Sequence, residues 1–194
     1  FVNMPLFHGI IRLNQDGSID SSFLAYLNGM TKFFPSAFQP DGKIIIGMGA
    51  KYCNRLNNDG STDSTFFYNE GTGFDDYINS IALQNDGKIV VAGEFDLFDG
   101  HACGKIARMN SDGTYDSTFN TGIGFDFLGA EVLTIQPDGK ILVGGDFDKF
   151  NGINQKGLVR LNTDGSKDTT FIVGGGISEK VFSIILQPDG KIIV

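Results

Sequence analysis

A short polar string that recurs four times carries oxygen-bearing side chains at alternate positions, as calcium-binding loops do. In the first copy these residues are Asn14, Asp16, Ser18 and Asp20. In an EF-hand loop, however, the first ligand position would fall on a cation, Arg12, and the twelfth on Phe23, and all four copies share both departures. Asn, Asp and Gly also stabilise tight turns through side-chain hydrogen bonds to the backbone. We therefore expect a hairpin turn and no metal site.

The same string holds an arginine and an aspartate that are eight residues apart in every copy. The pairs are Arg12 and Asp20, Arg55 and Asp63, Arg108 and Asp116, and Arg160 and Asp168. Across a short hairpin turn, residues at this spacing lie close together on paired strands. We predict a structural arginine–aspartate contact in each copy, which joins two neighbouring strands. A ring of charged ligand-binding groups is the functional alternative.

Two other groups of residues could carry chemistry. The acidic loops 94–100 and 146–152 could bind a cation, but we expect Phe95 and Phe147 to enter the core while the acids face water. The Gly-x-Gly stretches at 71–73, 122–124 and 174–176 are not followed by a lysine and a helix, which a phosphate-binding loop requires. We expect these glycines to serve turns.

Catalytic groups are few. His8 and His101 occupy non-equivalent loop positions, and nothing in the sequence pairs either of them with a nucleophile and an acid. Cys103 lies near His101 in sequence, which is weak support for a thiol nucleophile. Asp75 and Asp76 could form a carboxylate pair, but a loop of this sequence is more often simply solvated. We expect a protein that is not an enzyme and needs no cofactor.

The elements that position these residues repeat along the chain. The arginine-led strings start 43, 53 and 52 residues apart, and they alternate with four copies of Gln-x-Asp-Gly-Lys followed by a β-branched run. The unit is therefore about 52 residues long. One unit predicts strands at 131–136, 140–144, 157–162 and 167–171, joined by Gly-containing turns. No segment shows a sustained helical period, so we expect almost no helix.

A repeated four-stranded antiparallel unit predicts an all-β fold, a β-propeller with roughly 52 residues per blade. A β-solenoid and a β-sandwich are the alternatives. The strings Arg-Leu-Asn-x-Asp-Gly-Ser-x-Asp-x-Thr-Phe and Gln-x-Asp-Gly-Lys-Ile-x-Val-Gly-Gly-x-Phe resemble the delta-60 repeat family of bacterial β-propellers, over nearly the whole chain. The resemblance implies a large secreted or surface-exposed bacterial protein. It implies little about activity.

The expected organisation is a single propeller domain over residues 1–194. Its approximate units are 1–35, 36–80, 81–131, 132–183 and a partial unit 184–194. The first complete unit departs from the pattern, with 24–35 in place of Gly-x-Gly and Ala50 in place of the later phenylalanine. Because Phe1 and Val194 both fall inside a predicted blade, either the two ends pair and close a four-blade ring, or these residues are a piece of a longer propeller. We favour the longer propeller.

Composition and charge exclude several classes of binding partner. The chain has 41% hydrophobic and 20% charged residues, which is typical of a globular protein, and it contains 27 glycines and 18 phenylalanines. A net charge of −8 disfavours nucleic acid and anionic membranes. No apolar run approaches the length of a membrane span, so we expect no membrane insertion. Two cysteines allow at most one disulfide and leave the compartment open.

Propeller topology separates uniform turns from variable loops. The turns between strands one and two and between strands three and four repeat almost unchanged, whereas the other connections differ in every unit and carry aromatic residues. Such loops on one face suit recognition. The candidate binding residues are Tyr26, Phe33, Tyr52, Tyr77, Phe98, Phe127 and Phe150. We expect an extracellular or cell-surface binding or scaffold module, such as an adhesin, that contacts a protein or glycan. A sugar-active propeller and a phage or particle tail decoration are the alternatives.

Overall fold

The computed structural model describes residues 9–26, 35–48, 52–66, 73–174 and 177–194, and these contain strands and turns but no helix. Accordingly, no helix in this part of the chain is long and apolar enough to cross a membrane. The strands are β1 (Gly9–Leu13), β2 (Ile19–Tyr26), β3 (Ser36–Phe38), β4 (Ile44–Met48), β5 (Tyr52–Leu56), β6 (Ile78–Leu83), β7 (Ile89–Gly93), β8 (Leu97–Phe98), β9 (His101–Ala102), β10 (Ile106–Met109), β11 (Gly129–Ile135), β12 (Ile141–Asp146), β13 (Lys149–Phe150), β14 (Ile153–Asn154), β15 (Leu158–Leu161), β16 (Ile185–Leu186) and β17 (Ile192–Ile193).

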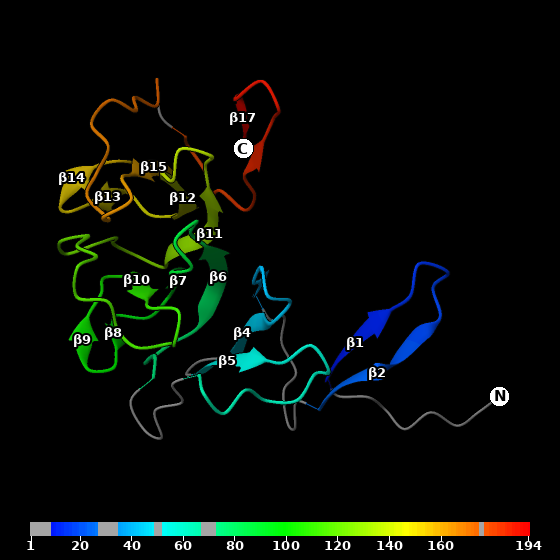
Figure 1. Ribbon diagram of the computed structural model, residues 1–194. Helices are drawn as coiled ribbons and strands as arrows, with labels where there is room; N and C mark the ends of the chain where they lie inside the picture. Colours follow the sequence, from blue (N-terminus) through cyan, green and yellow to red (C-terminus); the bar gives the residue numbers. More distant parts are fainter. Residues whose placement is uncertain (1–8, 27–34, 49–51, 67–72, 175–176) are drawn as a thin grey trace.

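Three antiparallel sheets of three strands follow one another along the chain (Figure 1). We call them blade one (β3, β4 and β5), blade two (β6, β7 and β10) and blade three (β11, β12 and β15), each with its second strand in the middle. The hairpin β1–β2 precedes blade one and the hairpin β16–β17 follows blade three. Two short ribbons, β8–β9 and β13–β14, join the second and third strands of blades two and three.

The predicted fourth strand is reduced to one bridge in each blade. Leu56 bridges Thr62, Met109 bridges Tyr115 and Leu161 bridges Lys167. The reason is that the aspartate at the start of this strand takes over the local backbone donors. In blade two, Asp116 Oδ1 accepts the N–H of Thr118 at 3.0 Å, and the Asp116 carbonyl accepts the N–H of Phe119 at 3.2 Å. These local hydrogen bonds turn the chain away from a regular ladder.

The middle strand of each blade is buried on both faces. In β7, Ile89 and Val91 pack into the core shared with blade one, while Val90 and Ala92 pack into the core shared with blade three. Successive side chains of a strand point to opposite faces, so a strand enclosed by two neighbours must be apolar throughout. This requirement explains the uninterrupted β-branched runs that follow each Gln-x-Asp-Gly-Lys string.

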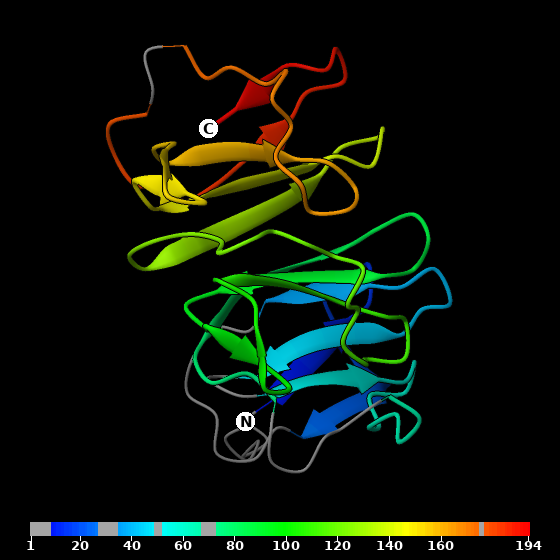
Figure 2. The ribbon, with the colours of Figure 1, turned by 90° about the vertical axis from the view of Figure 1, so that its left-hand side faces the viewer.

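The two flanking hairpins pack on opposite ends of this row of blades (Figures 1 and 2). Phe23 and Ala25 of β2 pack against Ile46 of blade one, and Ile192 of β17 packs against the cluster that contains Leu142 of blade three. Within the described residues, β1 pairs only with β2 and β16 only with β17. No ring closure between the two hairpins is therefore observed among these residues.

The connections separate to two ends of each blade, as the topology predicts. The repeated turns gather at one end, where Asn58 Nδ2 donates to the carbonyl of Asp41. At the other end, the incoming segments of blades two and three lie beside the longer second connections of these blades: Phe74 bridges Phe98, and Phe125 bridges Phe150. Figure 2 shows the hairpin turns toward the right and the longer connections toward the left. We call the second set, the connections between strands two and three and between successive blades, the variable-loop face.

Candidate functional site

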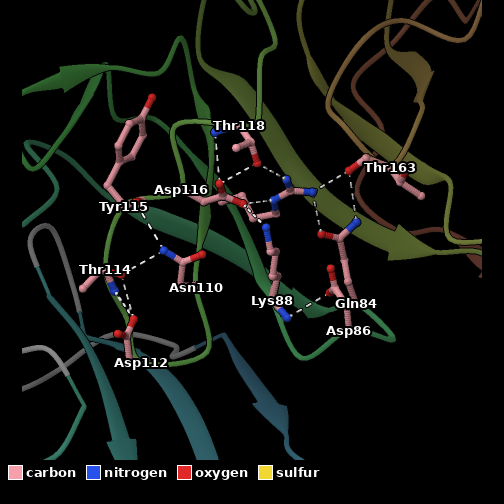
Figure 3. A network of polar contacts seen from close by, with 11 residues as sticks. Gln84, Asp86, Lys88, Asn110, Asp112, Thr114, Tyr115, Asp116, Thr118 and Thr163 are labelled. Atoms are coloured by element: carbon pink, nitrogen blue, oxygen red, sulfur yellow. Dashed lines mark hydrogen bonds and ion pairs between the residues drawn. The ribbon is translucent and has the colours of Figure 1, made fainter.

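A network of charged and polar side chains joins the strands of blade two at the turn end (Figure 3). Asp116 Oδ2 accepts hydrogen bonds from Arg108 Nε and Lys88 Nζ, both at 2.7 Å, and its Oδ1 accepts from Thr118 Oγ1 at 2.6 Å. Arg108 and Asp116 are only 6% and 4% exposed. A buried carboxylate that is saturated by two cations and a hydroxyl fixes the relative positions of three segments.

The predicted arginine–aspartate contact is present in all four copies. The Nε–Oδ2 distances are 2.7 Å for Arg12–Asp20, Arg55–Asp63 and Arg108–Asp116, and 2.8 Å for Arg160–Asp168. Lys43 and Lys140 complete the networks of blades one and three as Lys88 does in blade two. The described residues supply no such lysine to Asp20.

Sequence reasoning did not pair these lysines with the aspartates. Lys43 donates to Asp63 at 2.6 Å and Lys140 donates to Asp168 at 2.8 Å. The signal was available, because every complete unit carries one Asp-Gly-Lys for each arginine–aspartate pair.

Three of the four arginines also reach the next unit. Nη1 of Arg12, Arg55 and Arg108 donates to the backbone carbonyls of Asn58, Ser111 and Thr163, respectively, at 2.9, 2.8 and 2.6 Å. These three carbonyls occupy the same position of successive turns. The repeated string is therefore an element that links neighbouring blades as well as a turn.

The phenylalanine that ends each string takes part in the same joint. Phe119 lies under the guanidinium of Arg108, at 4.8 Å, and against Gly165 of the next turn. A Cβ atom at Gly165 would come within 3.0 Å of the Phe119 ring, and Gly165 has a φ of +90°. Glycine is thus required there both by the turn and by the neighbouring blade.

The charge network lowers the pKa values of the aspartates. Burial opposes ionisation of Asp116, but hydrogen bonds from Lys88, Thr118 and Arg108 outweigh it and hold its pKa well below the usual range. Lys43 and Thr65 have the same effect on the pKa of Asp63, and Lys140 and Thr170 on that of Asp168. Hydrogen bonds from Ser22, aided by Arg12, lower the pKa of Asp20 to about 2. All four aspartates are therefore anionic at neutral pH.

The variable-loop face is organised by a second repeated aspartate. Asp75 Oδ1 accepts the backbone N–H groups of Asp96 and Leu97 at 2.9 and 2.8 Å. Asp126 does the same for Asp148 and Lys149, at 2.9 and 2.8 Å. The predicted burial of Phe95 and Phe147 is confirmed. Asp75 therefore has a structural task here, that of holding a loop to the segment that enters its blade.

The structure divides the candidate binding aromatics. Phe98 and Phe150 are buried beneath Phe74 and Phe125, respectively, with ring centroids 4.3 and 4.9 Å apart, so we remove them from the candidate surface. Their loops fold inward because these rings complete the blade cores. Tyr52 and Tyr77 are half-buried. Phe33, Ala50 and the loop that follows Tyr26 lie outside the described residues.

Among the candidate aromatics whose side chains the structure describes, Phe127 is the exposed one. Its side chain is 66% exposed and its backbone φ is +50°, in the left-handed region that bulky residues rarely adopt. It borders a cavity of about 410 Å³, whose other walls include Asp146 and Glu179. Within the described part of the chain, neither of these carboxylates forms a hydrogen bond or an ion pair through its side chain. The pocket therefore offers an aromatic face together with acceptor oxygens.

Two of the candidate catalytic groups, His101 and Cys103, have packed surroundings. The His101 ring stacks on Tyr115, with centroids 4.2 Å apart and an interplanar angle of 5°. Cys53 and Cys103 are both free and buried, and burial raises the pKa of their thiols to about 12 and about 11. His8 lies outside the described residues.

The calcium-like string forms the predicted turn. Asp16 Oδ1 accepts hydrogen bonds from the N–H and the hydroxyl of Ser18 at 2.9 and 2.6 Å. The same bonds recur from Ser61, Thr114 and Ser166. Across the residues described, no group of three or more His, Cys, Asp or Glu side chains is arranged to hold a metal ion. Gly122 and Gly124, at φ +68° and +76°, serve turns as expected.

Comparisons with known proteins bear on the fold. No curated protein matches this chain. One solved structure that matches is described as an oxidoreductase (glucose dehydrogenase) from Thermus thermophilus, with 17% identity and a TM-score of 0.48. The match covers 71% of this chain and 45% of that one, so this chain spans less than half the length of that structure.

The model of a β-propeller family of unknown function, DUF5122, matches residues 9–23, 84–119 and 136–171. The second and third segments start 52 residues apart and contain the same strands and turns of blades two and three. The first segment contains the equivalent hairpin β1–β2. The chain has a β-propeller fold, and in these three segments it is similar to a β-propeller repeat family.

Proposed function

We propose that this chain is a non-catalytic binding module of a larger bacterial surface or secreted protein of the delta-60 repeat type. In this proposal the turn end, with its arginine–aspartate–lysine networks, holds the blades together. The variable-loop face carries recognition. The assignment of these two roles is based on the contrast between repeated turns of nearly constant sequence and loops that differ from blade to blade.

The observation that carries the proposal is the setting of Phe127. A bulky side chain at φ +50° costs stability, and such strain is retained where the surroundings or a function demand it. Here the ring is not buried to satisfy a core, since it is 66% exposed beside a pocket. Exposed aromatic anchors bordered by polar groups are typical energetic centres of binding surfaces.

The environments of the histidine and cysteines favour binding over catalysis. A thiol whose pKa lies near 11 or 12 stays protonated at neutral pH and is a weak nucleophile. The imidazole of His101 is stacked on a tyrosine rather than paired with an acid and a nucleophile.

A glycan-binding propeller is the second candidate. The pocket beside Phe127 combines an aromatic face with the carboxylates of Asp146 and Glu179. An aromatic ring can pack on the apolar face of a sugar, while carboxylate oxygens accept from hydroxyl groups. A protein partner would be expected to bury the Phe127 ring without using both carboxylates.

The proposal is tested with Phe127→Ala and Phe127→Gly in the whole chain. Binding to arrayed bacterial surface polysaccharides and surface proteins should weaken about tenfold or more in both variants, because an anchor ring is lost. Phe127→Gly should also keep or raise the melting temperature, since glycine adopts a positive φ without strain.

Asn85→Ala is the matched control, because Asn85 is exposed on the turn end. It should leave binding unchanged. The proposal is wrong if binding persists in both Phe127 variants, or if substitutions at the turn end weaken it while Phe127→Ala does not.

A further inference from the structure

The outer rim of blade three is hollowed by a cavity with a volume of about 690 Å³. One wall comes from the ribbon β13–β14 and the residues after it, including Lys149, Asn154 and Lys156. The other comes from the segment after the outer turn, including Lys167, Thr169 and Val173. This volume lies in the range of small-molecule binding sites.

The charge of this rim is opposite to that of the whole chain. Three lysines face the cavity, whereas the chain carries a net charge of −8. Lys156 pairs with Asp148 at 3.4 Å, and both side chains are about half exposed. In the described part of the chain, the side chains of Lys149 and Lys167 have neither an ion pair nor a hydrogen bond. Two uncompensated ammonium groups at one cavity favour an anionic ligand.

Blade two shows that the propeller repeat does not require these lysines. Lys149 pairs with Asn154 as Leu97 pairs with Ala102, and Lys167 bridges Leu161 as Tyr115 bridges Met109. Leucine and tyrosine therefore stand in blade two where lysines stand in blade three.

The residue of blade two that corresponds to Lys156 is a glycine, Gly104. The residues that follow Gly104 and Lys156 make the same backbone hydrogen bond, from Lys105 N to the Phe95 carbonyl and from Gly157 N to the Phe147 carbonyl, each at 3.0 Å. Gly104 therefore corresponds to Lys156. At all three positions, blade three therefore has a lysine where blade two has another residue.

The two rims differ in space as well as in charge. In blade two the rim is filled by the stacked rings of His101 and Tyr115, and the corresponding cavity, which Tyr115 also lines, measures only about 240 Å³. In blade three the equivalents of the two rings are Ile153 and Lys167, and the cavity is open. The same fold thus closes the rim in one blade and opens it in the next.

The remaining lining residues narrow the ligand class. Phe171 and Val173 are half-buried and provide apolar surface, while Asn154 and Thr169 are exposed polar groups. An inorganic anion would use only the lysines, and an apolar ligand would leave them unpaired. A sugar ring that carries a carboxylate can contact all three kinds of lining residue. Its C–H face packs on the apolar side chains, its hydroxyl groups hydrogen bond to the polar ones, and its carboxylate pairs with lysine.

We propose that the outer rim of blade three binds an acidic saccharide, with Lys149 and Lys167 as the groups that recognise its carboxylate. The inference rests on the proposed function in that one wall belongs to the variable-loop face. The two cavities share Asp148 and Lys156, but Phe127 does not line this one, and Lys149 and Lys167 do not line the other.

The test is isothermal titration of the whole chain with digalacturonic acid, with digalactose as the neutral match and inorganic phosphate as the simple anion. Digalacturonic acid should bind at least tenfold more tightly than either, and its affinity should fall as NaCl concentration rises. Lys149→Leu and Lys167→Tyr, which install the residues of blade two, should each weaken binding about tenfold.

Lys191→Leu is the charge-matched control. It removes one positive charge from β16–β17, where the Lys191 side chain is 76% exposed, and it should leave affinity unchanged. Melting temperatures of all three variants should stay close to that of the parent, because none of these lysines belongs to a buried network.

Several results would overturn the inference. Equal binding of digalactose would remove the role of charge, and equal binding of phosphate would reduce the rim to a simple anion site. Absence of binding, or affinity indifferent to both rim variants, would refute it outright. Phe127→Ala separates this inference from the proposed function. Suppose that the Phe127→Ala variant still binds digalacturonic acid with unchanged affinity and also still binds to the arrays. The proposed role of Phe127 is then wrong, while the acidic-saccharide site of blade three stands.

Discussion

Blade two and the hairpin β1–β2 contain the same arginine–aspartate pair in different surroundings. Arg108 and Asp116 are buried. Arg108 donates to Gln84, Asp116 accepts from Lys88, and both bond to Thr118. Arg12 and Asp20 lie at the surface, with side-chain exposures of 42% and 22%, and among the described residues Asp20 has Ser22 but no lysine. The contact distance is 2.7 Å in both. Equal distances therefore do not mean equal energies, because burial decides what the loss of a partner costs.

The largest effect should follow from Asp116→Ala. Removal of this carboxylate leaves Arg108 buried and uncompensated and Lys88 without its acceptor, so the free energy of unfolding should fall by about 3–5 kcal/mol. Denaturant unfolding followed by circular dichroism measures the loss. Asp20→Ala is the matched comparison, and its loss should be clearly smaller. If the two variants lose the same stability, burial does not distinguish the two pairs.

Arg108→Met should have an intermediate effect. Asp116 keeps Lys88 and Thr118, but the bond to the Thr163 carbonyl disappears, so we expect a loss of about 1–3 kcal/mol. Hydrogen exchange should show faster opening at the joint between blades two and three. An unchanged melting temperature together with loss of ligand binding would reverse the structural role assigned to this arginine.

The smallest expected effect is a loss of stability at low pH. Since folding lowers the pKa of Asp20 from the ordinary value near 4 to about 2, its ionised form stabilises the hairpin fully above about pH 4. That contribution is lost as the pH falls through the folded pKa. Carbon-13 NMR of the carboxyl groups should show Asp20 protonating first, while Asp63 and Asp116, whose pKa values are lower still, remain ionised. Protonation of Asp116 before Asp20 would contradict the ranking.

The sequence was sufficient to predict the repeat, the turns and the arginine–aspartate contacts. Spacing across a short hairpin turn indicates which side chains face each other, so Arg55 and Asp63 could be paired without coordinates. The buried second strand could also be inferred, because only a strand covered on both faces reads as a continuous apolar run.

Other features depend on packing that spacing does not encode. A phenylalanine in a loop can turn inward or outward, and Phe150 is buried whereas Phe127 is exposed. The fourth strand was overpredicted, because the chain turns where the Asp168 carbonyl accepts the N–H of Phe171. The open rim of blade three follows from which side chains fill a volume, which requires the three-dimensional arrangement of several segments.

The direction of the arginine links has a consequence for synthesis on the ribosome. Each linking arginine finds its carbonyl in a turn that is made later, 46, 56 and 55 residues further along the chain for Arg12, Arg55 and Arg108. At roughly 5–20 residues per second, that delay lasts roughly 3–10 s. A newly made unit can form its own hairpins at once, but its arginine cannot make the inter-blade hydrogen bond until the following turn has been synthesised. We therefore expect each added turn to stabilise the unit before it, and the blades to assemble in the order of translation.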